Sequence, residues 1–202
     1  MISPVSGSLD FWRRANGVED NSRVPQSMIK LTNLPVAAIL LGAAVIPAQA
    51  QTKPASAKSI LLEKAEDWSA YAAQNGKEKL CYALAQPNNR LPAGLNRDPA
   101  YFYVWMDPSK NVRNEVSVIL GFPTKDGSDA TATIGSSNFA FSTKNGNAWL
   151  KNPAESNRFI DAMRRGDKLT MKATSARGNA LTDSYSLSGI AAAVSRAAKE
   201  CP

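Results

Sequence analysis

Few residues of this chain could take part in chemistry, and histidine is absent from all 202 positions. Without histidine the chain cannot build Ser-His-Asp or Cys-His nucleophiles, histidine general bases or histidine-ligated zinc. Residues 51–202 also lack the Ser-x-x-Lys, Gly-x-Ser-x-Gly, Walker and Gly-x-Gly-x-x-Gly motifs of other common catalytic and cofactor sites. We therefore predict a protein that is not an enzyme, with no catalytic residues, no cofactor and no metal.

The acidic residues leave one catalytic alternative open, a hydrolase that uses two cooperating carboxylates as glycosidases do. Nothing in their spacing selects such a pair. The segment Asp126-Gly127-Ser128-Asp129 resembles part of a calcium loop, but it lacks the remaining ligands and the closing glutamate. We interpret this segment as a solvated turn.

The two cysteines, Cys81 and Cys201, lie 120 positions apart. In an oxidising compartment an even pair most simply forms one disulfide, here between the C-terminal tail and the first strands. Closing so long a loop would stabilise the fold by about 4.7 kcal/mol in the chain-entropy model. A redox-active pair is the alternative, but the chain has no Cys-x-x-Cys motif and no histidine to lower a thiol pKa.

Residues 28–50 have the three parts of a secretory signal peptide. Lys30 supplies a positive start, residues 34–46 form an apolar run, and Ala48-Gln49-Ala50 form a small-x-small cleavage site. A run of 13 residues is shorter than the roughly 20 that a membrane-spanning helix needs. We predict cleavage between Ala50 and Gln51, a periplasmic or secreted location and no permanent transmembrane segment. A buried helix of a cytosolic domain is the alternative.

The segments before and after this signal define the remaining regions of the chain. Residues 1–27 carry three acidic side chains where a signal should be short and positive, so we interpret them as an over-extended start or a disordered leader. Met28, rather than Met1, is then the expected start. Residues 51–59 are small and polar and predict a flexible leader, and residues 60–202 fit a single domain.

The formal net charge of the chain is +7, and removal of residues 1–50 takes away four basic and three acidic residues, which leaves +6. A basic exported protein is expected to meet anionic envelope polymer or membrane rather than nucleic acid. The densest basic group is Arg164, Arg165, Lys168 and Lys172. We interpret it as complementing a helix C-terminus and protecting a sheet edge, with an anion-binding patch as the alternative.

Short alternating segments separated by Gly, Asn and Asp predict an antiparallel β-sandwich or barrel rather than βαβ units. One helix is expected after Asn152-Pro153, ending at Gly166, and a second from about Ser188 to the C-terminus. The spacing of the second helix directs Cys201 towards the core. The expected strands span residues 68–73, 78–86, 101–106, 115–122, 130–134, 138–143, 148–151, 168–174 and 183–187.

One predicted strand has two apolar faces. Tyr101, Tyr103 and Trp105 share one face, and the residues between them share the other. Two interpretations stay open: a helix or the N-terminal segment covers the aromatic row, or the row is exposed and offers a stacking surface for a glycan or an apolar partner. These three residues are therefore the candidate binding surface.

Several short blocks occur in an order that resembles the invasion-associated locus B family of alphaproteobacteria, over residues 68–201. The blocks are Asp67-Trp68, Cys81-Tyr82, Arg97-Asp98-Pro99-Ala100-Tyr101-Phe102, Arg113-Asn114-Glu115-Val116-Ser117-Val118, Gly127-Ser128-Asp129-Ala130 and Asp183-Ser184-Tyr185-Ser186-Leu187-Ser188-Gly189. The resemblance implies an exported all-β domain with no known catalytic residues, in a family named for an association with entry into host cells. Some family members carry a further cysteine after the first tryptophan, where this chain has residues 69–73 without one, so a second disulfide is excluded.

Together these features predict an exported, non-enzymatic cell-envelope protein that contributes to host-cell contact or invasion. The alternative is a structural periplasmic protein that binds anionic envelope polymer or glycan. A carboxylate-dependent hydrolase is the third hypothesis. The expected partners are a cell-envelope polymer or a host-surface protein.

Overall fold

The computed structural model of the chain describes residues 58–75, 78–125 and 127–202. The predicted signal peptide at residues 28–50, its cleavage site and the leader assigned to residues 1–27 lie outside the described residues. The predicted leader at residues 51–59 is described only from Lys58, where the first strand begins.

Eleven strands within the described residues form one sheet in which all neighbours pair antiparallel, in the order β1-β2-β3-β5-β6-β9-β8-β7-β10-β11-β4. The strands are β1 (Lys58–Ala65), β2 (Trp68–Asn75), β3 (Glu78–Ala85), β4 (Asn89–Leu91), β5 (Tyr101–Asp107), β6 (Val112–Ile119), β7 (Asp129–Ile134), β8 (Ser137–Lys144), β9 (Asn147–Leu150), β10 (Lys168–Thr174) and β11 (Ala180–Ser186). Two α-helices, α2 (Ser156–Arg165) and α3 (Ile190–Glu200), and the 3-10 turns η1 (Pro108–Lys110) and η2 (Pro153–Glu155) complete the described elements.

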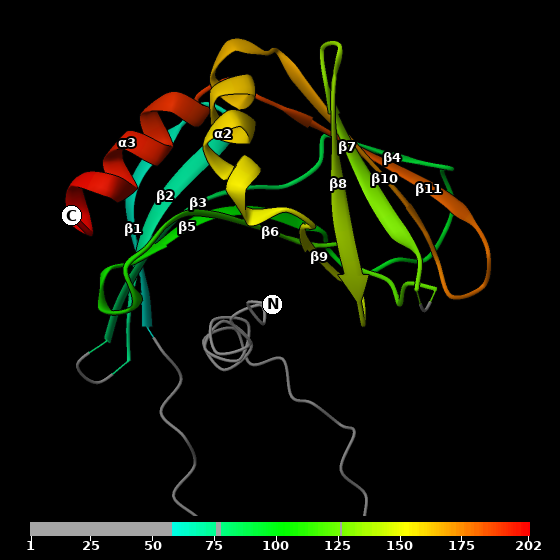
Figure 1. Cartoon of the computed structure of the whole chain (residues 1–202), viewed down its shortest axis with the longest axis horizontal. Helices are drawn as coiled ribbons and strands as arrows, with labels where there is room; N and C mark the ends of the chain where they lie inside the picture. The colour runs from blue at the N-terminus through cyan, green and yellow to red at the C-terminus, as the bar shows by residue number, and fades with distance from the viewer. Residues whose placement is uncertain (1–57, 76–77, 126) are drawn as a thin grey trace, which may run out of the picture. The chain divides into compact units, whose positions relative to one another are not determined.

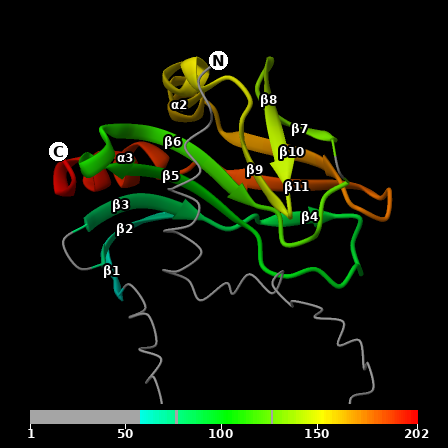
Figure 2. The same ribbon diagram turned by 60° about the horizontal axis from the view of Figure 1, so that its bottom comes forward.

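The sheet bends into two layers that face each other. Strands β1, β2, β3, β5 and β6 make one layer, and β7, β8, β10, β11 and β4 make the other, with β9 between them (Figures 1 and 2). The rings of Phe102 in β5 and Tyr185 in β11 meet across the interior, with centroids 5.4 Å apart. The predicted antiparallel β-sandwich with a C-terminal helix is therefore confirmed.

Helix α2 closes the space between the two layers with one aromatic side chain. The ring of Phe159 lies 6.0 Å from Phe102, 4.7 Å from Phe139 and 5.6 Å from Phe141, measured between centroids. Burying a phenylalanine contributes roughly 1.5–3 kcal/mol, and aromatic pairs add to that figure. Phe159 is thus the central packing residue of the core.

Helix α3 packs on the first layer, over β1, β2 and β3. Buried alanines on the facing strands, among them Ala70, Ala72 and Ala83, leave room for its apolar stripe. At the end of the helix Cys201 forms the predicted disulfide with Cys81 of β3, with the two Cα atoms 5.8 Å apart. The C-terminal tail is therefore fixed to the core by a covalent bond as well as by packing.

The predicted helix between Asn152 and Gly166 is confirmed, but the reason for its glycine differs from the expectation. Asn152 Oδ1 accepts a hydrogen bond from the Ala154 amide at 3.2 Å, and Pro153 opens the first turn. Gly166 has an extended backbone rather than the left-handed conformation of many helix C-termini. A Cβ there would lie 2.6 Å from Ile134 Cγ2, so close packing against β7 requires the glycine.

Two other expectations need correction. The predicted strand at residues 115–122 is β6 at Val112–Ile119, because Gly121 turns the chain with φ +72° and its Cα sits against the Asp98 carbonyl, where a Cβ would be 2.1 Å from the oxygen. Lys168 and Lys172 do not protect a sheet edge, since β10 lies between β7 and β11.

Candidate functional site

Strand β5 has the two apolar faces that its sequence predicts. Phe102 belongs to the core cluster, whereas Tyr103 and Trp105, on the opposite face, do not. The disulfide and Phe159 place α3 and α2 on the Phe102 face. The two described helices therefore do not cover the aromatic row, and the N-terminal segment up to residue 57, the other cover that we expected, lies outside the described residues.

The three predicted binding residues have different environments. Tyr103 and Trp105 are buried, with 4% and 6% of their surface exposed, whereas Tyr101 is half-buried. The row as a whole is thus not an open stacking surface. Tyr101, at its beginning, lines a pocket that is described below.

Tyr101 also belongs to a row of tyrosines on the outer face of β2, β3 and β5, which we call the tyrosine row. Ring centroids are 5.3 Å apart from Tyr71 to Tyr82, 5.6 Å from Tyr82 to Tyr103 and 6.2 Å from Tyr103 to Tyr101. The two inner tyrosines are buried and the two end tyrosines, Tyr71 and Tyr101, are half-buried. Burial raises the pKa of Tyr82, whose hydroxyl lies 3.1 Å from Ser59 Oγ.

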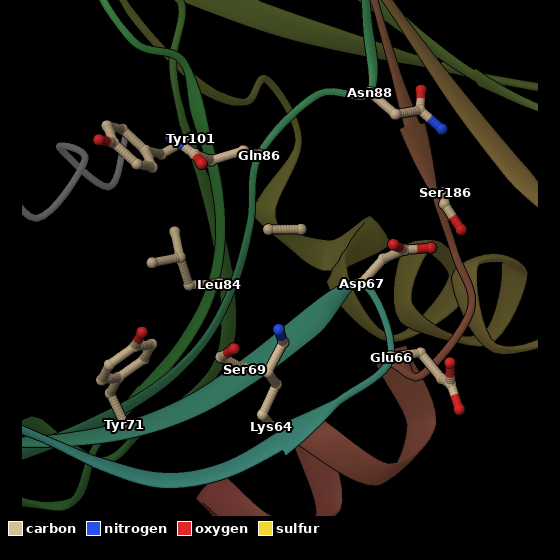
Figure 3. Close-up of a pocket in the computed structure, with 11 residues that line it drawn as sticks. Lys64, Glu66, Asp67, Ser69, Tyr71, Leu84, Gln86, Asn88, Tyr101 and Ser186 are labelled. Atoms are coloured by element: carbon tan, nitrogen blue, oxygen red, sulfur yellow. The ribbon is translucent and has the colours of Figure 1, made fainter.

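The half-buried ends of the row line a pocket of about 460 Å³ (Figure 3). In Figure 3 Tyr71, Leu84 and Tyr101 stand on one side of this pocket, and Asp67 and Ser186 stand on the other. We call this space the turn pocket, because the turn between β1 and β2 forms its rim. Its lining residues are Lys64, Glu66, Asp67, Ser69, Tyr71, Leu84, Ala85, Gln86, Asn88, Tyr101 and Ser186.

Contacts from distant parts of the chain fix the rim of the turn pocket. The Asp67 amide faces the Ser188 carbonyl at 3.4 Å, and the Trp68 indole nitrogen donates to the Ser186 carbonyl at 2.9 Å. Gly189 has φ +89° and packs so closely on Ala65 that a Cβ would lie 2.0 Å from its carbonyl oxygen. These contacts hold the β1–β2 turn against the end of β11.

Most polar side chains of the turn pocket are not engaged within the described part of the chain. Those of Lys64, Glu66, Asp67, Ser69, Gln86 and Asn88 form no hydrogen bond or ion pair with any other described residue. The pocket therefore offers a small ligand both ring contacts and hydrogen bonds.

The carboxylates of the turn pocket do not have the arrangement of a glycosidase. Such enzymes place two carboxylates on opposite sides of the scissile bond. Glu66 and Asp67 are neighbours in one turn, and both lie on the side of the pocket that faces the tyrosines (Figure 3). The described residues also contain no group of three His, Cys, Asp or Glu side chains that could hold a metal ion. Asp126 lies outside the described residues, and Asp129 pairs with Lys151.

A buried ion network, which the sequence did not predict, positions the start of β5. Asp183 of β11 accepts from Arg97 Nη1 at 3.0 Å and from Arg90 Nε at 3.2 Å. Arg90 also donates to the carbonyls of Asp98, at 2.8 Å, and Leu120, at 2.9 Å. Asp183 is 3% exposed, so the two arginines neutralise a charge that would otherwise be costly to bury.

This network gives a structural role to two of the sequence blocks. Arg97 and Asp183 belong to separate blocks of the family resemblance and form an ion pair in the structure. The network therefore joins β4, β11 and the segment that leads into Tyr101. The signal in the sequence was one charge of each sign in two separate blocks, with nothing to show that the two would meet.

Sequence reasoning missed most of the turn pocket. Lys64 lies in a strand, β1, that was not predicted, and Glu66 and Asp67 follow that strand. Gln86 and Asn88 lie in a connection. Of the predicted surface only Tyr101 contributes to it. The basic group from Arg164 to Lys172 lies elsewhere, on α2 and β10, with exposed side chains.

Comparison with known proteins finds structural similarity but no match of sequence. No protein-family model matches it, and no curated protein matches it. Among solved structures it is similar to the crystal structure of invasion associated protein b from Bartonella henselae, with 14% sequence identity and a TM-score of 0.49. The alignment covers 70% of this chain and 97% of that chain. None of the described helices is long and apolar enough to cross a membrane.

Proposed function

We propose that this chain is an exported, non-enzymatic protein of the cell envelope, of the invasion-associated locus B type, that binds a ligand through the turn pocket. The observation that carries export is the Cys81–Cys201 disulfide, which joins the last helix to β3. Disulfides form and persist in oxidising compartments and are rare in the cytosol. The signal-like residues 28–50 support the same conclusion from the sequence.

A binding role is supported by the lining of the turn pocket. The turn pocket combines half-buried tyrosines with unengaged polar side chains. Its carboxylates share one turn, which argues against a hydrolase. The contribution to host-cell contact rests on the family resemblance of the sequence blocks alone.

Cell fractionation tests the location. The natural protein is followed by osmotic shock and membrane separation, beside a cytosolic marker and an envelope marker, and its N-terminus is sequenced. We expect it in the periplasmic or surface fraction, with Gln51 as its first residue. Co-fractionation with the cytosolic marker, with residues 28–50 still attached, would refute the proposal.

A control variant sharpens the result. Replacing Leu40 with Arg places a charge inside the apolar run, which should block export and leave the precursor in the cytosol. If this variant were exported as well as the unchanged protein, residues 28–50 would not be the signal.

A further inference from the structure

We propose that the turn pocket binds an uncharged oligosaccharide, with sugar rings against Tyr71 and Tyr101 and sugar hydroxyls on the polar rim. This inference names the ligand of the proposed envelope protein, and it relies on that proposal only for where the protein would meet a glycan. Four features of the pocket support it: the two rings, the polar side chains, the local charge and the fixed shape.

The two tyrosines supply the apolar part of the site. Tyr71 and Tyr101 lie at opposite ends of the tyrosine row, and Leu84 lies between them on the same side of the pocket (Figure 3). The inner members of the row hold both rings in place, through Tyr82 at 5.3 Å and Tyr103 at 6.2 Å. A pyranose ring has a face of C–H groups that packs on an aromatic ring, and a fixed ring loses little entropy when it binds.

The polar residues of the pocket supply hydrogen bonds of mixed type. Asn88 and Gln86 each offer an amide donor and an acceptor, Ser69 offers a hydroxyl, and Asp67 offers a strong acceptor. None of these side chains is engaged by another described residue. Sugar hydroxyls both donate and accept, so they match such a set better than an apolar partner would.

The charge of the pocket selects against anionic ligands. Two carboxylates, Glu66 and Asp67, line it beside one ammonium group, that of Lys64. The pocket is thus locally acidic although the whole chain carries +7. An anionic polymer would be repelled here, whereas a neutral glycan would not.

The dimensions and rigidity of the pocket suit a short glycan. Its volume of about 460 Å³ falls in the range of roughly 300–1,000 Å³ that is usual for small-ligand sites. The rim is fixed by the bond from Trp68 to the Ser186 carbonyl and by the close contact of Gly189 with Ala65. Little ordering is then required when the ligand binds.

The test is an NMR titration of the isotope-labelled, disulfide-bonded protein, purified from cells that export it. The probes are N,N′-diacetylchitobiose, cellobiose and maltotriose, each raised to about 10 mM, a range that detects even weak affinity. We expect at least one probe to shift the amide signals of Asp67, Ser69 and Asn88 in a saturable way. A sulfated disaccharide is the anionic comparison and should shift none of them.

Matched variants connect the binding to the tyrosines. Tyr101→Ala should weaken the affinity about tenfold, and Tyr101→Phe, which keeps the ring, should change it by less than about twofold. Asn88→Ala, at an exposed position, should weaken it several-fold without a change in folding. Lys199→Ala, on the exposed side of α3, is the neutral control.

Three results would overturn the inference. One is the absence of saturable shifts at the turn pocket with all three uncharged probes. Another is a preference for the sulfated disaccharide. The third is binding that neither Tyr101→Ala nor Asn88→Ala weakens. If the protein still fractionates with the envelope, any of these results would refute the saccharide site and leave the envelope assignment intact. A cytosolic location would refute the envelope assignment alone.

Discussion

The two faces of the layer formed by β2, β3 and β5 are both apolar, yet they are built from different residues. The inner face carries alanines, Cys81, Phe102, Val104 and Met106, and both helices pack on it. The outer face carries four of the five tyrosines of the chain and Trp105. Tyrosine combines a large apolar ring with a hydroxyl that needs a polar partner, so the outer face is suited to meet polar groups and the inner face is not.

This difference teaches that burial alone does not mark a packing surface. Tyr103 is almost as inaccessible to solvent as Phe102. The ring of Tyr103, however, lies against the half-buried ring of Tyr101, which lines a pocket. On the inner face the side chains pack against the disulfide and the two helices. One face therefore supports the fold, and the other presents the candidate site.

The largest expected effect separates two adjacent residues of β5. Phe102→Ala removes a ring that contacts Trp68, Phe159 and Tyr185, and should lower the free energy of unfolding by about 3–5 kcal/mol. Tyr101→Ala, at a half-buried site, should lower it by about 1–2 kcal/mol. Denaturant unfolding with the disulfide intact measures both. Equal losses would contradict the distinction between the faces.

The buried ion network should show the next largest effect. Asp183→Asn leaves Arg90 and Arg97 without a counter-charge and should destabilise the fold by about 3 kcal/mol. The exposed pair of Arg164 and Asp161, 3.9 Å apart, provides the matched control, since Asp161→Asn should change stability by less than about 0.5 kcal/mol. A loss at Asp183 no larger than that of the control would mean that the network does not hold the start of β5.

How far the sequence could predict this molecule depended on whether the information was local. Short β-prone segments between turn residues located β7, β8 and β10 within a residue or two, and a run of aromatic residues between two Asp-Pro pairs located β5. The even cysteine pair indicated the disulfide. Strand β1 was missed because Ile60, Leu61 and Leu62 are consecutive apolar residues without alternation. Strand β4 was missed because it has only three residues, and its Arg90 is held by Asp183 from β11.

The candidate site was less predictable than the fold. Tyr101 was identified because an aromatic strand with two apolar faces is unusual. The other wall and the rim come from segments as far apart as Lys64 and Ser186, which only the folded chain brings together. No pattern in the sequence pairs these segments.

Asp107, at the far end of β5, should make the stability of the protein depend on pH. Burial alone would raise the pKa of Asp107, but hydrogen bonds from Lys110 and Ser109 and the charge of Lys110 outweigh it and hold the pKa below its ordinary value of 3.8. The stabilisation is therefore complete above about pH 5 and is lost as the pH falls through the lowered pKa. Asp107→Asn should cost about 1–2 kcal/mol at pH 7 and flatten the acid limb of the stability curve.

Unfolding measured from pH 7 to pH 2 checks this expectation. Because Asp107 lies at the end of β5 away from Tyr101, saccharide binding at pH 7 should be unchanged in the variant. An acid limb with the same slope in both proteins would show that Asp107 does not contribute as described.

The smallest expected effect concerns Tyr185 of β11, whose ring packs on Phe102 of the inner face from the other layer. Tyr185 is fully buried, burial raises its pKa, and its hydroxyl has no hydrogen-bond partner among the described residues. Tyr185→Phe should therefore stabilise the protein by about 1 kcal/mol, whereas Tyr82→Phe, which removes the bond to Ser59, should not. Thermal unfolding of both variants measures the difference. Destabilisation by Tyr185→Phe would mean that the Tyr185 hydroxyl contributes to the stability of the core.

The redox state of Cys81 and Cys201 in living cells tests the central claim most directly. The thiols are alkylated before lysis, and intact mass then reports how many carry the label. Export to an oxidising envelope predicts a protein with neither cysteine labelled and with two labels after reduction. Protein that carries both labels without reduction would contradict the account.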